Sequence, residues 1–186
     1  MVGQASLYDP TRFPPARASG CSIANFICNH DPKATDSQFL EKISKNIFVV
    51  AGTQVAIQTF IEQASILGFR AKPIRGAGGA FHTQAMARAQ AGLRKAVGNA
   101  ALTIPKDCLI YSNVTGEPYS SLSELRSLLV RQIVCPVMWH DTITNMRCDV
   151  NDLYFIACGP GEQLRSMLSA IDSDLGSATI LSEQMI

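Results

Sequence analysis

Residues 46–75 read NIFVVAGTQVAIQTFIEQASILGFRAKPIR and carry a clear strand–helix–strand signal. The first seven residues are rich in β-branched side chains, which favour a strand. Thr53 can then cap a helix, in which apolar residues recur at helical spacing. That apolar face consists of Ile57, Phe60, Ile61, Ala64 and Leu67. The helix is expected to end near Gly68, and residues 69–75 return as a strand.

The residues before this stretch predict only part of the same unit. Residues 22–28 form a short apolar run that predicts one further strand, and the polar residues 29–45 have the character of an insertion. Together the order is β-β-α-β, which is the later portion of a split βαβ unit. Its opening strand and helix are not visible in the sequence.

Strand and helix signals continue to alternate beyond residue 76. Strands are expected at residues 107–111, 153–158 and 178–181, and Ser121-x-x-Glu124 is a capping box that opens a helix. This alternation predicts the α/β class with a largely parallel sheet. The inward-facing residues expected in the helices are Met86, Ala89, Leu93 and Val97; Leu125, Leu128, Leu129 and Ile133; Trp139, Ile143 and Met146; and Leu164, Met167, Leu168 and Ile171.

The bulk composition argues against several classes of function. The chain has 186 residues and a formal net charge of +1, so we expect no nucleic-acid partner. No run approaches the roughly 18 apolar residues that would span a bilayer, so we expect no membrane partner. The six cysteines form no C-x-x-C pair and no zinc-type spacing with histidine, which predicts no metal site and a reducing compartment. Residues 1–21 contain three prolines and no signal-peptide core, and are expected to be a linker.

One stretch is strongly basic. No Asp or Glu occurs from Gln63 to Lys106. Such a run is either a solvated face or a patch that attracts an acidic partner. The residues of this basic window that would meet a partner are Arg70, Lys72, Arg75, Arg88, Arg94 and Lys95.

His82 is the candidate base. It follows a glycine-rich loop and precedes a helix, where the positive end of the helix dipole disfavours an imidazolium. A base also needs its second ring nitrogen held by an acceptor. The carbonyl of Gln132 would normally accept from residue 136, but Pro136 has no N–H. That carbonyl therefore needs another donor if it is buried, and a histidine Nδ1–H would serve.

The chain offers no convincing nucleophile for that base. It contains no G-x-S-x-G elbow of the kind that exposes a serine. Cys158, before Gly159-Pro160-Gly161, is a possible substitute, although a structural strand end accounts for it more simply. Residues 76–79 could cradle a phosphate, but they lack the lysine of a P-loop, and a flexible turn is the simpler interpretation.

Four segments resemble one family in the correct order. Residues 79–86 (GAFHTQAM) resemble the G-A-F-H-[ST]-x-x-M signature of malonyl-CoA:acyl-carrier-protein transacylases and related acyltransferase domains of fatty-acid and polyketide synthases. Residues 110–116 resemble Y-S-N-V-x-G, residues 129–139 resemble L-x-x-Q-[LI]-x-x-P-V-x-W, and residues 155–164 resemble F-x-x-G-P-G-x-x-L. The resemblance covers residues 22–171.

The resemblance implies a fold and a reaction. The fold would be a partial ferredoxin-like small subdomain (residues 22–76) and part of an α/β-hydrolase-like acyltransferase large subdomain (residues 77–186). The reaction would be ping-pong transfer of malonyl from malonyl-CoA, through a serine, to the phosphopantetheine thiol of acyl carrier protein in fatty-acid synthesis, with no cofactor. The implied roles are a general base for His82, a carbonyl that orients its ring for Gln132, a narrowed acyl pocket for Phe81 and an active-site mouth for Asn25.

The chain also departs from that family. The family's serine, oxyanion-hole donors and malonyl-binding arginine all precede the region of resemblance, so the isolated chain is expected to be inactive. The motifs resemble the mitochondrial branch, with a cytoplasmic or plastid-type location as the alternative. The alternative function is a catalytically inactive, truncated relative that binds acidic acyl carrier protein through the basic window.

Overall fold

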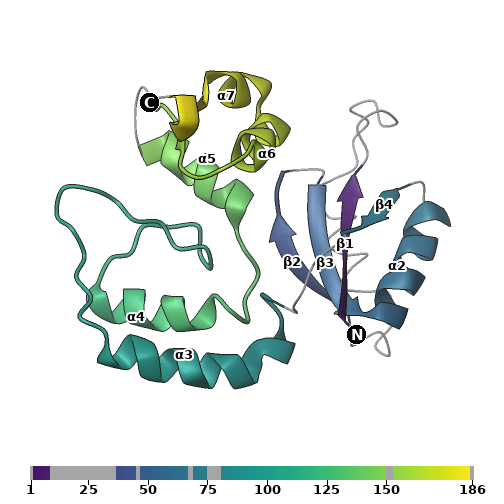
Figure 1. Ribbon diagram of the computed structural model, residues 1–186, viewed down its shortest axis with the longest axis horizontal. Coiled ribbons are helices and arrows are strands. Elements are labelled where there is room, and N and C mark those ends of the chain that lie inside the picture. The colour runs from purple at the N-terminus through teal and green to yellow at the C-terminus, as the bar shows by residue number, and fades with distance from the viewer. Residues whose placement is uncertain are drawn as a thin grey trace.

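The computed structural model of the chain describes residues 2–8, 37–44, 47–66, 69–74, 81–149 and 153–184. Two regions follow each other along the chain (Figure 1): an N-terminal sheet with one helix against it, and a C-terminal region made mostly of helices. The expected α/β class is confirmed. None of the helices within these ranges is both long and apolar enough to cross a bilayer.

The N-terminal sheet has four antiparallel strands in the order β2-β3-β1-β4. Strand β1 (Val2–Tyr8) lies in its interior and pairs with both β3 (Ile47–Thr53) and β4 (Arg70–Pro73), and β2 (Ser37–Lys42) is the outer neighbour of β3. The connection from β3 to β4 therefore crosses over β1, as in a split βαβ unit.

Two expectations for the N-terminus were wrong. Residues 2–8 are not part of a linker, because they form the opening strand of the split βαβ unit, which was expected to be absent. Residues 37–42, inside the expected insertion, form β2. Both segments contain few β-branched residues, and their strand state depends on neighbours in the sheet rather than on local propensity. The strand expected at residues 22–28 lies outside the described residues.

Helix α2 (Gln54–Ile66) packs against the sheet through the face that its sequence predicts. The Thr53 Oγ1 accepts a hydrogen bond from the backbone N–H of Ala56 at 3.2 Å, which is the expected N-cap. Strand β3 alternates its side chains between two faces, so that Val50 joins the core of α2. The buried residues of this core are Val50, Ile57, Phe60 and Ala64, with Ile61, Phe69 and Ala71 packed beside them.

The C-terminal region begins with a short 3₁₀ turn, η1 (Gln84–Met86), and α3 (Ala87–Asn99). Helix α3 lies beside α4 (Leu122–Arg131), and the two run in opposite directions (Figure 1). Helices α5 (Trp139–Asp149), α6 (Gln163–Ile171) and α7 (Ser173–Ala178) follow. Strands β5 (Ile156–Ala157) and β6 (Ile180–Leu181) pair in parallel, and η2 (Ser182–Gln184) ends the described chain.

The capping box of α4 is present in a modified form. The Ser121 Oγ accepts from the N–H of Glu124 at 3.2 Å, as expected. The Glu124 carboxylate reaches one residue further back than in the standard box and accepts from the backbone N–H of Ser120 at 2.8 Å and from its hydroxyl at 2.5 Å. The Ser120 hydroxyl and backbone hydrogen bonds lower the pKa of Glu124.

Other expectations hold only in part. Leu125, Leu128, Ile143 and Leu168 are buried as predicted, whereas α3 buries none of its residues fully among the described part of the chain. Residues 107–111 do not form a strand, and the one bridge there joins Tyr111 to Pro118. The parallel sheet amounts to β5 and β6 within the described ranges, and the larger sheet is antiparallel.

Candidate active site

His82 occupies an unusual backbone conformation. Its φ angle is 64°, in the left-handed region that residues other than glycine seldom adopt. The residue is half-buried. The helix start that follows is capped by its neighbour: the Thr83 Oγ1 accepts from the N–H of Ala85 at 3.3 Å, and α3 itself begins only at Ala87. The glycine-rich residues 76–79 lie outside the described residues.

The end of helix α4 holds His82 at two points. The His82 Nδ1 lies 2.7 Å from the carbonyl oxygen of Gln132. Pro136 predicted only that this carbonyl needs another donor, and the pairing with His82 was implied by the family resemblance. The backbone N–H of His82 donates to the carbonyl of Ile133 at 2.9 Å. Two consecutive carbonyls at the end of one helix thus receive the ring and the main chain of one residue. A carbonyl can only accept, so Nδ1 carries the proton and Nε2 is left with a lone pair.

The helix that provides these carbonyls also sets the electrostatics. The last carbonyls of α4 form the negative end of its dipole. The ring contacts this helix end through Nδ1, whereas α3 begins five residues after His82, at Ala87. Among the residues that the structure describes, no hydroxyl or thiol is bonded to Nε2.

Hydrogen bonds between α3 and α4 fix the elements that present His82. The Arg126 guanidinium on α4 donates to the carbonyls of Val97 and, at 2.8 Å, Ala100 at the end of α3. Near the other end, the Gln90 Nε2 donates to the carbonyl of Val130 at 3.3 Å. Nothing in the sequence pattern pointed to Arg126 or Gln90, because neither belongs to a recognisable motif.

The structure describes some of the other predicted site residues but not all of them. Phe81 directly precedes His82 and is 52% exposed, whereas Asn25 lies outside the described residues. The basic window is divided between two elements, with Arg70 and Lys72 on β4 and the remaining described residues on α3. These are Arg88, Arg94 and Lys95, all exposed; Arg75 is outside the described residues. Cys158 is exposed after β5.

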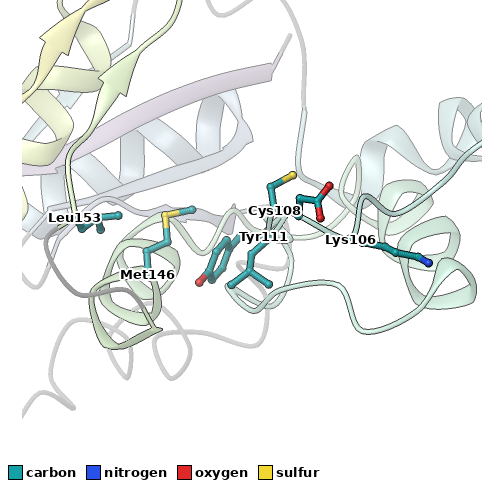
Figure 2. Close-up of a pocket in the computed structure, with 7 residues that line it drawn as sticks. Lys106, Cys108, Tyr111, Met146 and Leu153 are labelled. Carbon is teal, nitrogen blue, oxygen red and sulfur yellow. The ribbon is translucent and has the colours of Figure 1, made fainter.

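A separate hollow of about 490 Å³ contains none of the predicted site residues (Figure 2). It is lined by Lys106, Asp107, Cys108, Leu109, Tyr111, Met146 and Leu153. The Tyr111 hydroxyl donates to the Asp149 Oδ2 at 2.6 Å. Burial, this hydrogen bond, and the negative charges of Asp149 and Glu117 raise the pKa of Tyr111 to about 12. Within the described part of the chain, no group of three or more His, Cys, Asp or Glu residues could hold a metal.

Comparison with known sequences identifies the relatives of this chain. No family model matches it. It is 32% identical over 156 residues to a probable mitochondrial malonyl-CoA-acyl carrier protein transacylase of Drosophila melanogaster, covering 82% of this chain and 37% of the relative. It is 31% identical over 123 residues to the mitochondrial malonyl-CoA-acyl carrier protein transacylase of Mus musculus, covering 64% and 32%. The chain thus spans about a third of the length of these curated relatives.

Solved structures agree on the fold. An acyl-carrier-protein-S-malonyltransferase from Bartonella henselae matches with a TM-score of 0.79 and 22% identity, covering 99% of this chain and 55% of that protein. A malonyl CoA-acyl carrier protein transacylase from Clostridium perfringens matches with a TM-score of 0.78 and 22% identity, covering 98% and 53%. The chain spans only part of the length of these relatives. By its sequence relatives and its fold, it belongs to the malonyl-CoA:acyl-carrier-protein transacylase family.

Proposed function

We propose that this chain provides the general base of an enzyme that transfers malonyl from malonyl-CoA to acyl carrier protein. The observation that carries the proposal is the hydrogen bond from His82 Nδ1 to the Gln132 carbonyl, because it leaves Nε2 free to accept a proton. The relatives that support this substrate pair are named as malonyl-CoA-acyl carrier protein transacylases.

In the proposed mechanism, His82 serves both halves of a ping-pong reaction. A serine supplied by polypeptide beyond this chain loses its proton to Nε2 and attacks the malonyl thioester, and the protonated ring then returns the proton to the departing CoA thiolate. In the second half, Nε2 takes the proton of the acyl carrier protein thiol, which attacks the malonyl-serine ester, and the ring returns that proton to the serine. No cofactor is needed.

The proposal assigns supporting roles to two neighbours of the ring. The Gln132 carbonyl is a positioning group, since it fixes both the tautomer and the direction of Nε2. Phe81, exposed and adjacent to His82, would narrow the acyl pocket beside the malonyl α-carbon. Asn25 is proposed at the mouth of the site on the sequence resemblance alone.

Acyl carrier protein would approach through the basic residues of α3. Arg88, Arg94 and Lys95 lie on one exposed helix, whereas Arg70 and Lys72 lie on β4 of the other region. Reversing the three charges on α3 should weaken binding, with the largest effect at low salt, because exposed charges are screened over about 8 Å at physiological ionic strength. Unchanged affinity after reversal would remove this surface from the proposal.

The alternative function is an inactive relative that binds acyl carrier protein without chemistry. Both versions predict that the isolated chain transfers no malonyl, because it has no G-x-S-x-G serine. They differ when a serine-bearing segment is present, since only the first version then predicts transfer. The fly and mouse relatives are named as mitochondrial, and we propose the same compartment for this protein.

A chimera tests the proposal directly. This chain would replace the matching segment of the Drosophila relative, and transfer of radiolabelled malonyl from malonyl-CoA to acyl carrier protein would be measured. The His82→Ala chimera should lose activity by about 10²- to 10⁴-fold, the usual effect of losing a general base. His140→Gln is the matched control, because the Nδ1 of His140 bonds the carboxylate of its neighbour Asp141, at 3.0 Å, and not the Gln132 carbonyl. A His82→Ala chimera as active as the parent would refute the assignment.

A further inference from the structure

Gln90 is a polar residue on an otherwise apolar face of α3. Between residues 84 and 99, the half-buried side chains are those of Met86, Gln90, Leu93 and Val97, at the spacing of one helix face. Three of these four side chains are apolar, so a leucine or methionine would suit the remaining position. Burying an amide without a hydrogen-bond partner is costly. A glutamine at this position therefore indicates a specific partner.

That partner is a backbone carbonyl at the end of α4. The Gln90 Nε2 donates to the carbonyl oxygen of Val130 at 3.3 Å, and Val130 is 6% exposed. In a continuing helix this carbonyl would accept from the N–H of Val134, but that N–H donates to the carbonyl of Arg131 at 3.0 Å. The Val130 carbonyl is thus one of the acceptors that a helix end leaves unpaired, and the Gln90 amide satisfies it.

Three carbonyls at the end of α4 therefore bond either to His82 or to the first turn of α3. Gln90 bonds the carbonyl of Val130, the His82 ring bonds that of Gln132, and the His82 N–H bonds that of Ile133. The Gln90 bond lies two residues before the carbonyl that orients the imidazole. Helix ends are the parts of helices that fray, so a bond at this point restrains the carbonyl that the ring uses.

We infer that Gln90 is a positioning residue for His82. Its amide holds the end of α4 against the start of α3, and so keeps the Gln132 carbonyl at 2.7 Å from Nδ1. That contact favours the tautomer in which Nε2 carries no proton. The consequence for malonyl transfer rests on the proposed function, whereas the effect on the ring does not.

The tautomer of His82 measures this role without any assay of malonyl transfer. In the full chain with isotope-labelled histidine, long-range proton–nitrogen correlation spectra distinguish the two neutral forms of the ring. Gln90→Met keeps the length of the side chain and removes the donor. We expect it to raise the ratio of the Nε2–H to the Nδ1–H form about 3- to 10-fold, and to speed exchange of the His82 N–H by the same factor, the effect of one neutral hydrogen bond. If both stay unchanged, the inference is overturned.

Two further variants separate positioning from general stability. Gln90→Lys restores a donor on an unbranched stem and should return the tautomer ratio to within about twofold of the parent. Leu93→Ala removes packing from the same face of α3 and leaves the bond to Val130 in place. It should lower the thermal midpoint at least as much as Gln90→Met does, yet change the ratio less. A lysine that fails to restore the ratio, or an equal change in Leu93→Ala, would refute a positioning role.

The chimera with the Drosophila segment connects the ring to the reaction. There Gln90→Met should lower kcat by about 3- to 10-fold and leave KM for malonyl-CoA unchanged, because Gln90 acts through the base and not on substrate binding. An unchanged kcat together with a changed tautomer ratio would overturn the catalytic consequence. If His82→Ala is as active as the parent while Gln90→Met still changes the ratio, the proposed function is refuted and the positioning of the ring is not.

Discussion

Arg126→Met tests whether the guanidinium of Arg126 attaches α3 to the rest of the molecule. Helix α3 has no fully buried residue among the described part of the chain, and its apolar residues Leu93 and Val97 are only half-buried. Arg126 instead donates hydrogen bonds to the carbonyls of Val97 and Ala100 at the end of that helix. Methionine retains much of the aliphatic stem and removes the donors and the charge.

The magnitude follows from the bonds that are lost. Hydrogen bonds to a charged group contribute about 1.5–3 kcal/mol each, and a cation at a helix C-terminus contributes about 0.3–1 kcal/mol. The site is partly exposed, so the sum must be discounted for solvent screening. We expect the local opening free energy of α3 to fall by about 2–4 kcal/mol. At about 1.4 kcal/mol per tenfold change, its amides should exchange roughly 30- to 1,000-fold faster.

Native-state hydrogen exchange read by NMR measures this directly. Arg131→Met is the matched control, because Arg131 is an exposed arginine in the last turn of the same helix, and we expect it to change α3 exchange very little. The His82 N–H, which donates to Ile133, should lose protection together with α3 because η1 connects the two. An acceleration below about threefold in Arg126→Met, or an equal one in Arg131→Met, would refute this account of α3.

Three further predictions concern Tyr111, Gly176 and Gly92. Because the pKa of Tyr111 is raised to about 12, its phenol binds its proton more tightly in the folded state, so the stability it contributes is present below about pH 10 and lost as the pH rises towards 12. Asp149→Asn should lower that pKa, which ultraviolet titration against Tyr111→Phe measures. Gly176→Ala should destabilise the fold by about 1–3 kcal/mol, because its Cβ would lie 2.7 Å from the Cβ and 2.8 Å from the Cα of Ser169. Gly92→Ala, with nothing within 4 Å, should stabilise α3 by about 0.5–1 kcal/mol, and urea unfolding compares the two.

The elements that could be predicted are those whose signal is local. Helix α2 begins with a Thr53 cap and repeats its apolar residues at helical spacing. Its predicted face is confirmed at Ile57, Phe60, Ile61 and Ala64, and Leu67 lies outside the described residues. The sequence VGQASLY of β1 has no comparable signal, and it is a strand because β3 and β4 lie on its two sides. Residues 107–111 show the opposite case: their sequence has an apolar strand pattern, but they form no strand because no neighbouring strand among the described residues pairs with them.

The basic window shows a second limit of local reading. Its charged residues fall within one stretch of the sequence, yet they lie on two elements of the fold. Arg70 and Lys72 are on β4, and the others on α3 are Arg88, Arg94 and Lys95. A run of like charge therefore does not by itself define one surface. The proposal for acyl carrier protein must rest on the α3 residues, which do share an element.

One part of the candidate site could be predicted, because the sequence shows which helix carbonyl lacks a backbone donor. Pro136 has no N–H to donate to the carbonyl of Gln132. In the structure, the N–H groups of Val134 and Cys135 both donate to Arg131, at 3.0 Å each, and the Gln132 carbonyl receives the ring of His82 instead. The second attachment, from the His82 N–H to Ile133, had no such signal, because residue 137 is a valine with an N–H of its own. His82 makes both bonds with a φ of 64°, a conformation that no residue pattern in the sequence indicated. The missing donor at Pro136 thus explains why the Gln132 carbonyl is available to a side chain, whereas the backbone conformation of His82 could be found only in the structure.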